Sequence, residues 1–201
     1  MEDVKVLEEM IDETNETFDE VEKHRLFTML ISKCAKMGVE FGFDNVFDKY
    51  KWREVAMGSI LGHTVFAGAS GGRHIETYGA DALEADGAKA EYKTCTESDN
   101  WVEKIKKRRH YRVTMVYNGA YKDEAIDAYA DVKHYVGVFT NTGRCVAIAL
   151  VDTDYVVKTL RHNHVNRKPG TTTNCNGVAV DFDIDGKNPL IEIVYLADDL
   201  K

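Results

Sequence analysis

One seven-residue segment, Cys145 to Val151, constrains the fold more than any other part of the chain. It is apolar throughout and follows the turn-forming residues Asn141-Thr142-Gly143. A run this short cannot span a membrane, which takes about 20 apolar residues. An apolar strand of this length is typical of a sheet buried on both faces, because neither side meets water. We therefore expect a sheet covered on both faces and no membrane-spanning segment.

The remaining apolar pattern predicts helices first and strands afterwards. Helical spacing is found in 3–22, in 23–37 ending at Gly38, and in 49–63. Strand-like segments follow at 74–78, 80–84, 88–95, 110–117, 132–139, 144–151, 178–183 and 190–196. Further helical turns are expected at 123–130 and 155–160, and 162–177 is polar and irregular. This order predicts an α/β or α+β fold.

Length and composition fit one soluble domain over 1–201. The chain is 44% hydrophobic, which is enough to bury a sizeable core. Its first residues are acidic and lack the apolar stretch of a signal peptide, so we expect a cytoplasmic protein. The four cysteines are widely spaced, which excludes a zinc ribbon and a small disulfide scaffold.

The net charge of −8 is unevenly distributed along the chain. Residues 1–22 hold ten acidic side chains and one lysine, so the rest of the chain is close to neutral. Two basic runs lie in that remainder, one over 104–112 and one over 158–168. Such clusters can neutralise phosphates even on an acidic protein. The alternative interpretation is an ordinary solvated surface.

A predicted hairpin over 79–94 carries the residues of chemical interest. Asp86-Gly87 is a hairpin turn signal between two strand-like runs. Glu91 and Lys93 are two residues apart on the second strand and therefore share a face, whereas Tyr92 points the other way. Asp81 lies on the first strand, across the turn. The hairpin can thus bring two carboxylates and one ammonium to one edge of a sheet.

This set of groups suits metal-assisted hydrolysis of a phosphodiester. Carboxylate oxygens are the ligands that Mg²⁺ takes from proteins, together with water and substrate phosphate. The metal stabilises charge on the phosphate and lowers the pKa of a water. A lysine supplies positive charge beside the water or the phosphate, and acts on the proton if its own pKa is depressed. The alternative is a surface hairpin with an ordinary Glu–Lys pair.

The residues Asp81, Glu91 and Lys93 resemble the motif of the PD-(D/E)xK nuclease superfamily, in which an Asp starts one strand and Glu-x-Lys lies on the next. Ala80 stands in place of the family's proline, and Glu54 matches the glutamate that many members carry on the preceding helix. The resemblance covers 49–151, the expected catalytic core, between an N-terminal helical segment (1–37) and C-terminal strands (152–201). It implies a restriction-endonuclease-like α/β fold with a mixed central sheet flanked by helices.

The resemblance also implies a function. It points to a Mg²⁺-dependent endonuclease for double-stranded DNA of the type II restriction class, with Asp81 and Glu91 as metal ligands and a companion methyltransferase in the host. A palindromic target would require a homodimer. The expected DNA-binding residues are basic: Arg73, Lys104, Lys106, Lys107, Arg108, Arg109, Arg112, Arg167 and Lys168. Alternatives are a repair, recombination or phage nuclease of the same fold, and a non-catalytic DNA- or protein-binding module.

Other motifs are weaker. Three further acid-x-Lys triplets, beginning at Asp3, Asp131 and Asp185, lack a hairpin with a second acid. His162 and His164 would share a face if extended and, with Cys175, form a zinc site, but solvated loop histidines are the alternative. The glycine-rich loop 67–73 is not a P-loop, because it lacks Gly-Lys-Ser/Thr. That loop and 166–176 are candidate DNA contacts, with plain connections as the alternative.

Overall fold

The computed structural model describes residues 20–40, 51–66, 80–97, 99–117, 123–166 and 177–201. The chain divides into two compact units, one over 1–48 and one over 49–201. In the first, the described part is a single helix, α2 (Glu20–Glu40). The second unit begins where the sequence placed the start of the catalytic core, and all other described elements belong to it.

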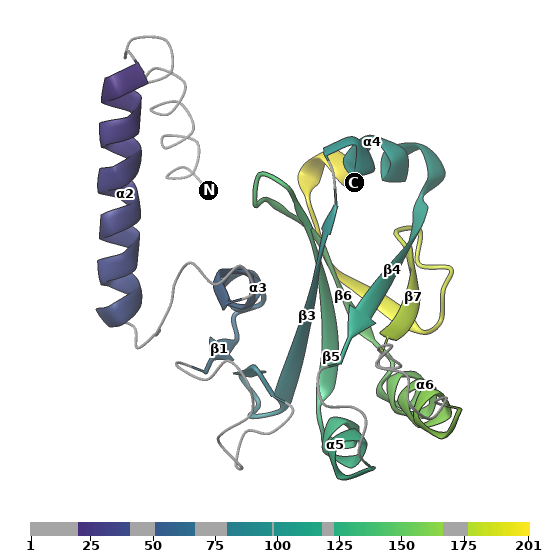
Figure 1. The fold of residues 1–201 in the computed structure, drawn as a ribbon. Coiled ribbons are helices and arrows are strands. Elements are labelled where there is room, and N and C mark those ends of the chain that lie inside the picture. The colour runs from purple at the N-terminus through teal and green to yellow at the C-terminus, as the bar shows by residue number, and fades with distance from the viewer. Residues whose placement is uncertain (1–19, 41–50, 67–79, 98, 118–122, 167–176) are drawn as a thin grey trace. The chain divides into compact units, whose positions relative to one another are not determined.

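The second unit alternates helices and strands (Figure 1). Its helices are α3 (Lys51–Leu61), α4 (Asp99–Arg108), α5 (Asp123–Ala128) and α6 (Thr153–Val165), with short 3-10 turns η2 (Tyr129–Asp131) and η3 (Asp198–Leu200). Its strands are β1 (Thr64–Val65), β2 (Ala82–Leu83), β3 (Lys89–Glu97), β4 (His110–Val116), β5 (Lys133–Thr140), β6 (Cys145–Val151), β7 (Gly177–Asp183) and β8 (Ile191–Leu196).

Six strands form a mixed central sheet in the order β1-β2-β3-β5-β6-β8. The β3–β5 pair is parallel, and the other neighbours are antiparallel. The parallel pair needs a long crossover, which α4, β4 and α5 occupy. Strands β4 and β7 form a separate antiparallel pair. The fold is therefore α/β with a mixed sheet and flanking helices, as the sequence predicted at that level.

The central sheet is buried on both faces. On one face, α3 packs over Tyr92, Tyr135 and Phe139 through Met57. On the other, α4, α5, α6 and the β4–β7 pair cover a larger apolar cluster (Figure 1). Six of the seven residues of β6 are buried, as expected for a strand covered on both sides.

Two glycines allow α3 to lie close to the sheet. A Cβ on Gly137 of β5 would lie 2.6 Å from the sulfur of Met57, and a Cβ on Gly58 would collide with the Val65 side chain. Contacts of that length are sterically excluded, so a side chain at either position would force Met57 or Val65 to move. The sequence treated Gly58 only as a weak point of the helix. The structure shows that it lets α3 lie directly against Val65 of β1.

Several sequence-based boundaries were wrong. Helix α2 continues through Gly38, and α6 is longer than the predicted 155–160 and includes part of the segment expected to be irregular. Helix α4 was not predicted. The expected helix 3–22 lies almost entirely outside the described residues, and the strand 74–78 lies wholly outside them. Among the described helices, none has the length and apolarity needed to cross a membrane.

Candidate active site

The predicted hairpin is confirmed, and it places Asp81 beside β3. Strands β2 and β3 pair antiparallel with Ala82 opposite Ala90. Gly87 takes the positive φ of 86° that the turn requires. The backbone N–H of Asp81 donates to the Ala90 carbonyl at 2.7 Å, and its own carbonyl accepts from Phe66 N–H at 2.9 Å. The Asp81 backbone is therefore held from both sides.

The Asp81 carboxylate is hydrogen-bonded to the backbone of Tyr92, the middle residue of the Glu-x-Lys triplet. Its Oδ2 accepts a hydrogen bond of 2.7 Å from the backbone N–H of Tyr92. Tyr92 itself points into the core under α3, as the alternation along the strand predicted. The bond fixes the Asp81 carboxylate next to the two functional residues that flank Tyr92.

Glu91 and Lys93 form an ion pair on the opposite face of β3 from Tyr92. Glu91 is only 5% exposed, and the Lys93 side chain is 17% exposed. The Lys93 ammonium also lies 5.0 Å from the centre of the Tyr117 ring, a cation–π geometry. The shared face of Glu91 and Lys93 is thus confirmed.

Glu54 reaches the same region from α3. Its carboxylate pairs with Lys51 at 2.9 Å, one helical turn earlier. Burial and the negative charge of Asp81 raise the pKa of Glu54 to about 7, against the opposing charges of Lys51 and Lys93. The contacts bring Asp81, Glu91 and Lys93 together on the hairpin, whereas Glu54, on the helix over the opposite face of β3, acts on them through its charge.

The electrostatics of this cluster favour a bound cation. Burial raises the pKa of Glu91 to about 7, while Lys93 lowers it and the charges of Asp81 and Glu54 raise it. The charges of Asp81 and Glu54 thus oppose ionisation of the buried Glu91, and Lys93 is its counter-ion. Burial alone would lower the pKa of Lys93, but Glu91 and Asp81 outweigh burial and raise it. Lys93 therefore stays an ammonium, which favours charge stabilisation over proton transfer.

The donor set fits a hard divalent cation such as Mg²⁺. Within the described residues, no group of three or more Asp, Glu, His or Cys side chains is arranged as a metal site. Mg²⁺ commonly takes only one or two carboxylates and completes its shell with water and phosphate. Asp81 and Glu91 are the two residues that would hold it, and its charge would oppose the burial and the repulsion that raise the pKa of Glu91.

A buried histidine, His134, and the tyrosines Tyr117 and Tyr129 form a hydrogen-bonded group beside Lys93, which the sequence did not predict. His134 is fully buried, with Nε2 at 2.9 Å from the Tyr129 carbonyl and Nδ1 at 3.0 Å from the Tyr117 hydroxyl. Burial lowers the pKa of His134 to about 4, so the ring is neutral. Because a carbonyl only accepts, Nε2 carries the proton and Nδ1 accepts from Tyr117. This group lies at the site because the register of the β3–β5 pair places His134 opposite Glu91.

The basic run 104–112 lies at the other end of β3 from Glu91. It forms the end of α4 and the start of β4, which follow directly after Glu97. Glu91 and Glu97 are six residues apart on one strand, which corresponds to about 20 Å. The run therefore does not line the carboxylate cluster.

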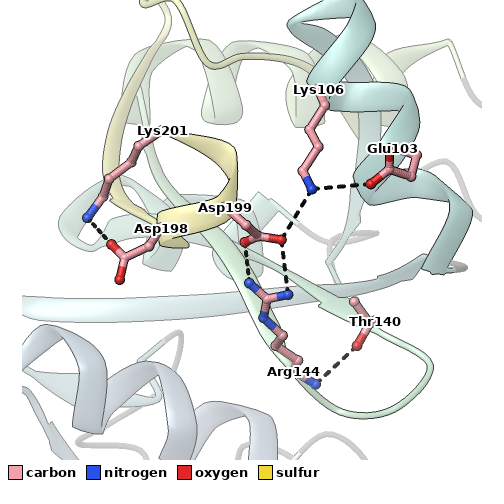
Figure 2. A network of polar contacts seen from close by, with 7 residues as sticks. All are labelled: Glu103, Lys106, Thr140, Arg144, Asp198, Asp199 and Lys201. Atoms are coloured by element: carbon pink, nitrogen blue, oxygen red, sulfur yellow. Dashed lines mark hydrogen bonds and ion pairs between the residues drawn. The ribbon is translucent and has the colours of Figure 1, made fainter.

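Two of these basic residues form ion pairs with acidic side chains of the chain itself. Lys106 lies 3.2 Å from Glu103 and 3.5 Å from Asp199, which also pairs with Arg144 (Figure 2). Arg109 binds Asp185 at 2.8 Å and the Leu200 carbonyl at 3.2 Å. The other members of the run are exposed: Lys104, Lys107, Arg108 and Arg112. Three further expected DNA contacts lie outside the described residues: Arg73, Arg167 and Lys168.

The alternative zinc site loses its geometric basis. His162 and His164 lie within α6 rather than in an extended loop, and residues two apart on a helix do not share a face. His164 instead lies 3.6 Å from Asp123 of α5. Cys175, most of 166–176 and the glycine-rich loop lie outside the described residues.

Comparison with known proteins leaves the carboxylate cluster as the main guide to function. No protein-family model matches the chain. No curated protein matches it either. The functional argument therefore rests on the geometry of Asp81, Glu91, Lys93 and Glu54.

We expect Glu54→Gln to flatten the pH dependence of stability. The folded protein binds the Glu54 proton more tightly than the unfolded chain, so stability falls as the pH rises from about 4.5 to about 7. Glutamine has the same shape, still accepts from Lys51 and never ionises. The variant should be more stable than the wild type at pH 8 by on the order of 1 kcal/mol, and no more stable at pH 4.5. Thermal unfolding across this range measures the difference, and parallel curves would contradict it.

Proposed function

We propose that the chain is a Mg²⁺-dependent DNA endonuclease with the restriction-endonuclease-like fold of the PD-(D/E)xK superfamily. One observation carries the proposal: the Asp81 carboxylate is bound to the backbone N–H of Tyr92, between Glu91 and Lys93. A surface hairpin with an incidental Glu–Lys pair would not need a second acid at that point, nor a buried glutamate.

The order of elements supports the proposal. A helix carrying Glu54 precedes a hairpin carrying Asp81, the long strand β3 carries Glu91 and Lys93, and a helix leads on to further strands of the same sheet. The unpredicted α4 and the separate β4–β7 pair are inserted between β3 and its parallel neighbour β5.

In the proposed reaction, water attacks a backbone phosphorus and the P–O3′ bond breaks, which leaves a 5′-phosphate and a 3′-hydroxyl. Asp81 and Glu91 would hold Mg²⁺, which when bound neutralises phosphate charge and lowers the pKa of a water. The Lys93 ammonium orients the attacking water or a phosphate oxygen and offsets the charge that develops there. Glu54 accepts from Lys51 and holds a proton near neutral pH. The burial of Glu91 excludes bulk water and strengthens these interactions.

The first test is cleavage of unmethylated plasmid and phage DNA with Mg²⁺ and with a chelator. We expect discrete fragments that appear only with the metal, as a type II restriction enzyme produces. Sequencing of their ends would then give the target, and a palindrome would favour a homodimer. Smearing or structure-dependent nicking would favour a repair, recombination or phage nuclease. Failure to cut any duplex, branched or single-stranded DNA would overturn the proposal and favour a binding module.

A further inference from the structure

Arg53, beside Glu54 in the first turn of α3, is a buried cation. It is only 8% exposed. Its guanidinium carbon lies 5.2 Å from the centre of the Trp52 ring and 5.6 Å from that of Phe139. Arginine is almost never this deeply buried unless an anion or a hydrogen-bond acceptor pairs with it.

Within the described part of the chain, Arg53 has no such partner. Its Nε atom is buried and has no hydrogen-bond acceptor there. Nor does any of the ion pairs formed by the described residues include Arg53. Two aromatic faces compensate a desolvated charge only in part. A cation in the first turn of a helix is also opposed by the helix dipole, which favours anions at that end. A bound anion would neutralise the charge of the guanidinium and would itself be stabilised by the helix dipole.

The position of Arg53 relates it to the carboxylate cluster. The guanidinium carbon of Arg53 lies 5.6 Å from the ring of Phe139, and Phe139 pairs with Thr96 of β3. Thr96 is three residues beyond Lys93, or about 10 Å along the strand. Of the residues of β3, only Lys89 and Ala90 pair with β2. From Glu91 onwards, among the described strands, β3 therefore has a neighbour on the β5 side alone.

We infer that Arg53 binds a phosphate diester of the nucleic acid, next to the phosphate held at Glu91 and Lys93. The inference rests on the proposed function and deepens it. The strand being cut would follow the open edge of β3, with one phosphate at the carboxylate cluster and a neighbouring one at Arg53. The planar guanidinium forms two parallel hydrogen bonds to phosphate oxygens, and the phosphate supplies the negative charge that Arg53 lacks.

The test compares Arg53→Met with wild type and with Arg25→Met, a control that removes an exposed arginine of α2 outside both basic runs. Affinity for a short DNA duplex is measured in chelator, so that no cleavage occurs, at several salt concentrations. Thermal unfolding is measured without DNA. Arg53→Lys tests whether a point charge replaces the planar guanidinium.

For Arg53→Met we expect an affinity about tenfold weaker than that of the wild type and a salt dependence reduced by about one released ion. The unfolding temperature without DNA should be unchanged or higher, because an unpaired buried charge has been removed. Arg53→Lys should bind with intermediate affinity. Arg25→Met should retain the wild-type salt dependence.

A wild-type salt dependence in Arg53→Met would overturn the inference, whether or not the variant is less stable, because Arg53 would then act only in packing. If Arg53→Met fails to fold, the same criterion applies to Arg53→Lys. The two proposals fail separately. Wild-type cleavage with normal DNA binding by Arg53→Met overturns the role of Arg53 alone. Loss of binding in Arg53→Met, without Mg²⁺-dependent cleavage by the wild type, overturns the endonuclease and leaves Arg53 as a phosphate ligand.

Discussion

Replacing Glu91 by glutamine is expected to reduce Mg²⁺-dependent DNA cleavage at least about a hundredfold while DNA binding in chelator survives. The amide keeps the size of the carboxylate and still accepts from Lys93, so β3 should keep its packing. It removes the negative charge that a hard cation requires. A metal ion stabilises the transition state by several kcal/mol, and each 1.36 kcal/mol is worth a factor of ten in rate.

The matched control is Glu192→Gln, which changes an exposed glutamate on β8 of the same sheet. Cleavage rates of wild type and both variants are compared at saturating Mg²⁺, and unfolding temperatures show whether each is folded. The control should cut at the wild-type rate. Should Glu91→Gln also cut at that rate, Glu91 is not a metal ligand and the carboxylate cluster is not the active site.

The hairpin at the site could be predicted because its determinants are local. Asp86-Gly87 specifies the turn, and the turn fixes which residues face one another. The two-residue period of a strand then places Glu91 and Lys93 on one face. The buried strand β6 could be predicted for a similar reason. An apolar run of that length is too short to span a membrane and is typical of a strand covered on both faces.

The features that sequence reasoning missed depend on distant contacts. Helix α4 contains Val102 and Ile105 at helical spacing, but the surrounding lysines and arginines were read only as a charge run. His134 lies at the site only because β5 pairs with β3 across more than forty residues of chain. The burial of Arg53 contradicts the rule that places charged residues at the surface, so apolar periodicity cannot reveal it.

Replacing Lys93 by methionine is expected to reduce cleavage at pH 7 at least about a hundredfold, and the deficit should shrink as the pH rises to 9. Loss of the ammonium removes the charge that stabilises the reacting phosphate. It also removes the main influence that lowers the pKa of Glu91, which is already raised to about 7 by burial. Glu91 then holds its proton at neutral pH and cannot bind the metal. Raising the pH restores the carboxylate but not the ammonium, so recovery is partial.

The pH profile separates these two roles of Lys93. The control is Lys133→Met on β5, which breaks a comparable ion pair to Glu84. It should leave the cleavage profile unchanged. The protonated Glu91 of Lys93→Met is neutral, so the variant buries no unpaired charge at pH 7 and should remain folded by thermal unfolding. A deficit of the same size at pH 7 and pH 9 would contradict the coupling and leave Lys93 acting on the phosphate alone. Wild-type cleavage at both pH values would remove Lys93 from the reaction, because a methionine can replace neither its charge nor its hydrogen bonds.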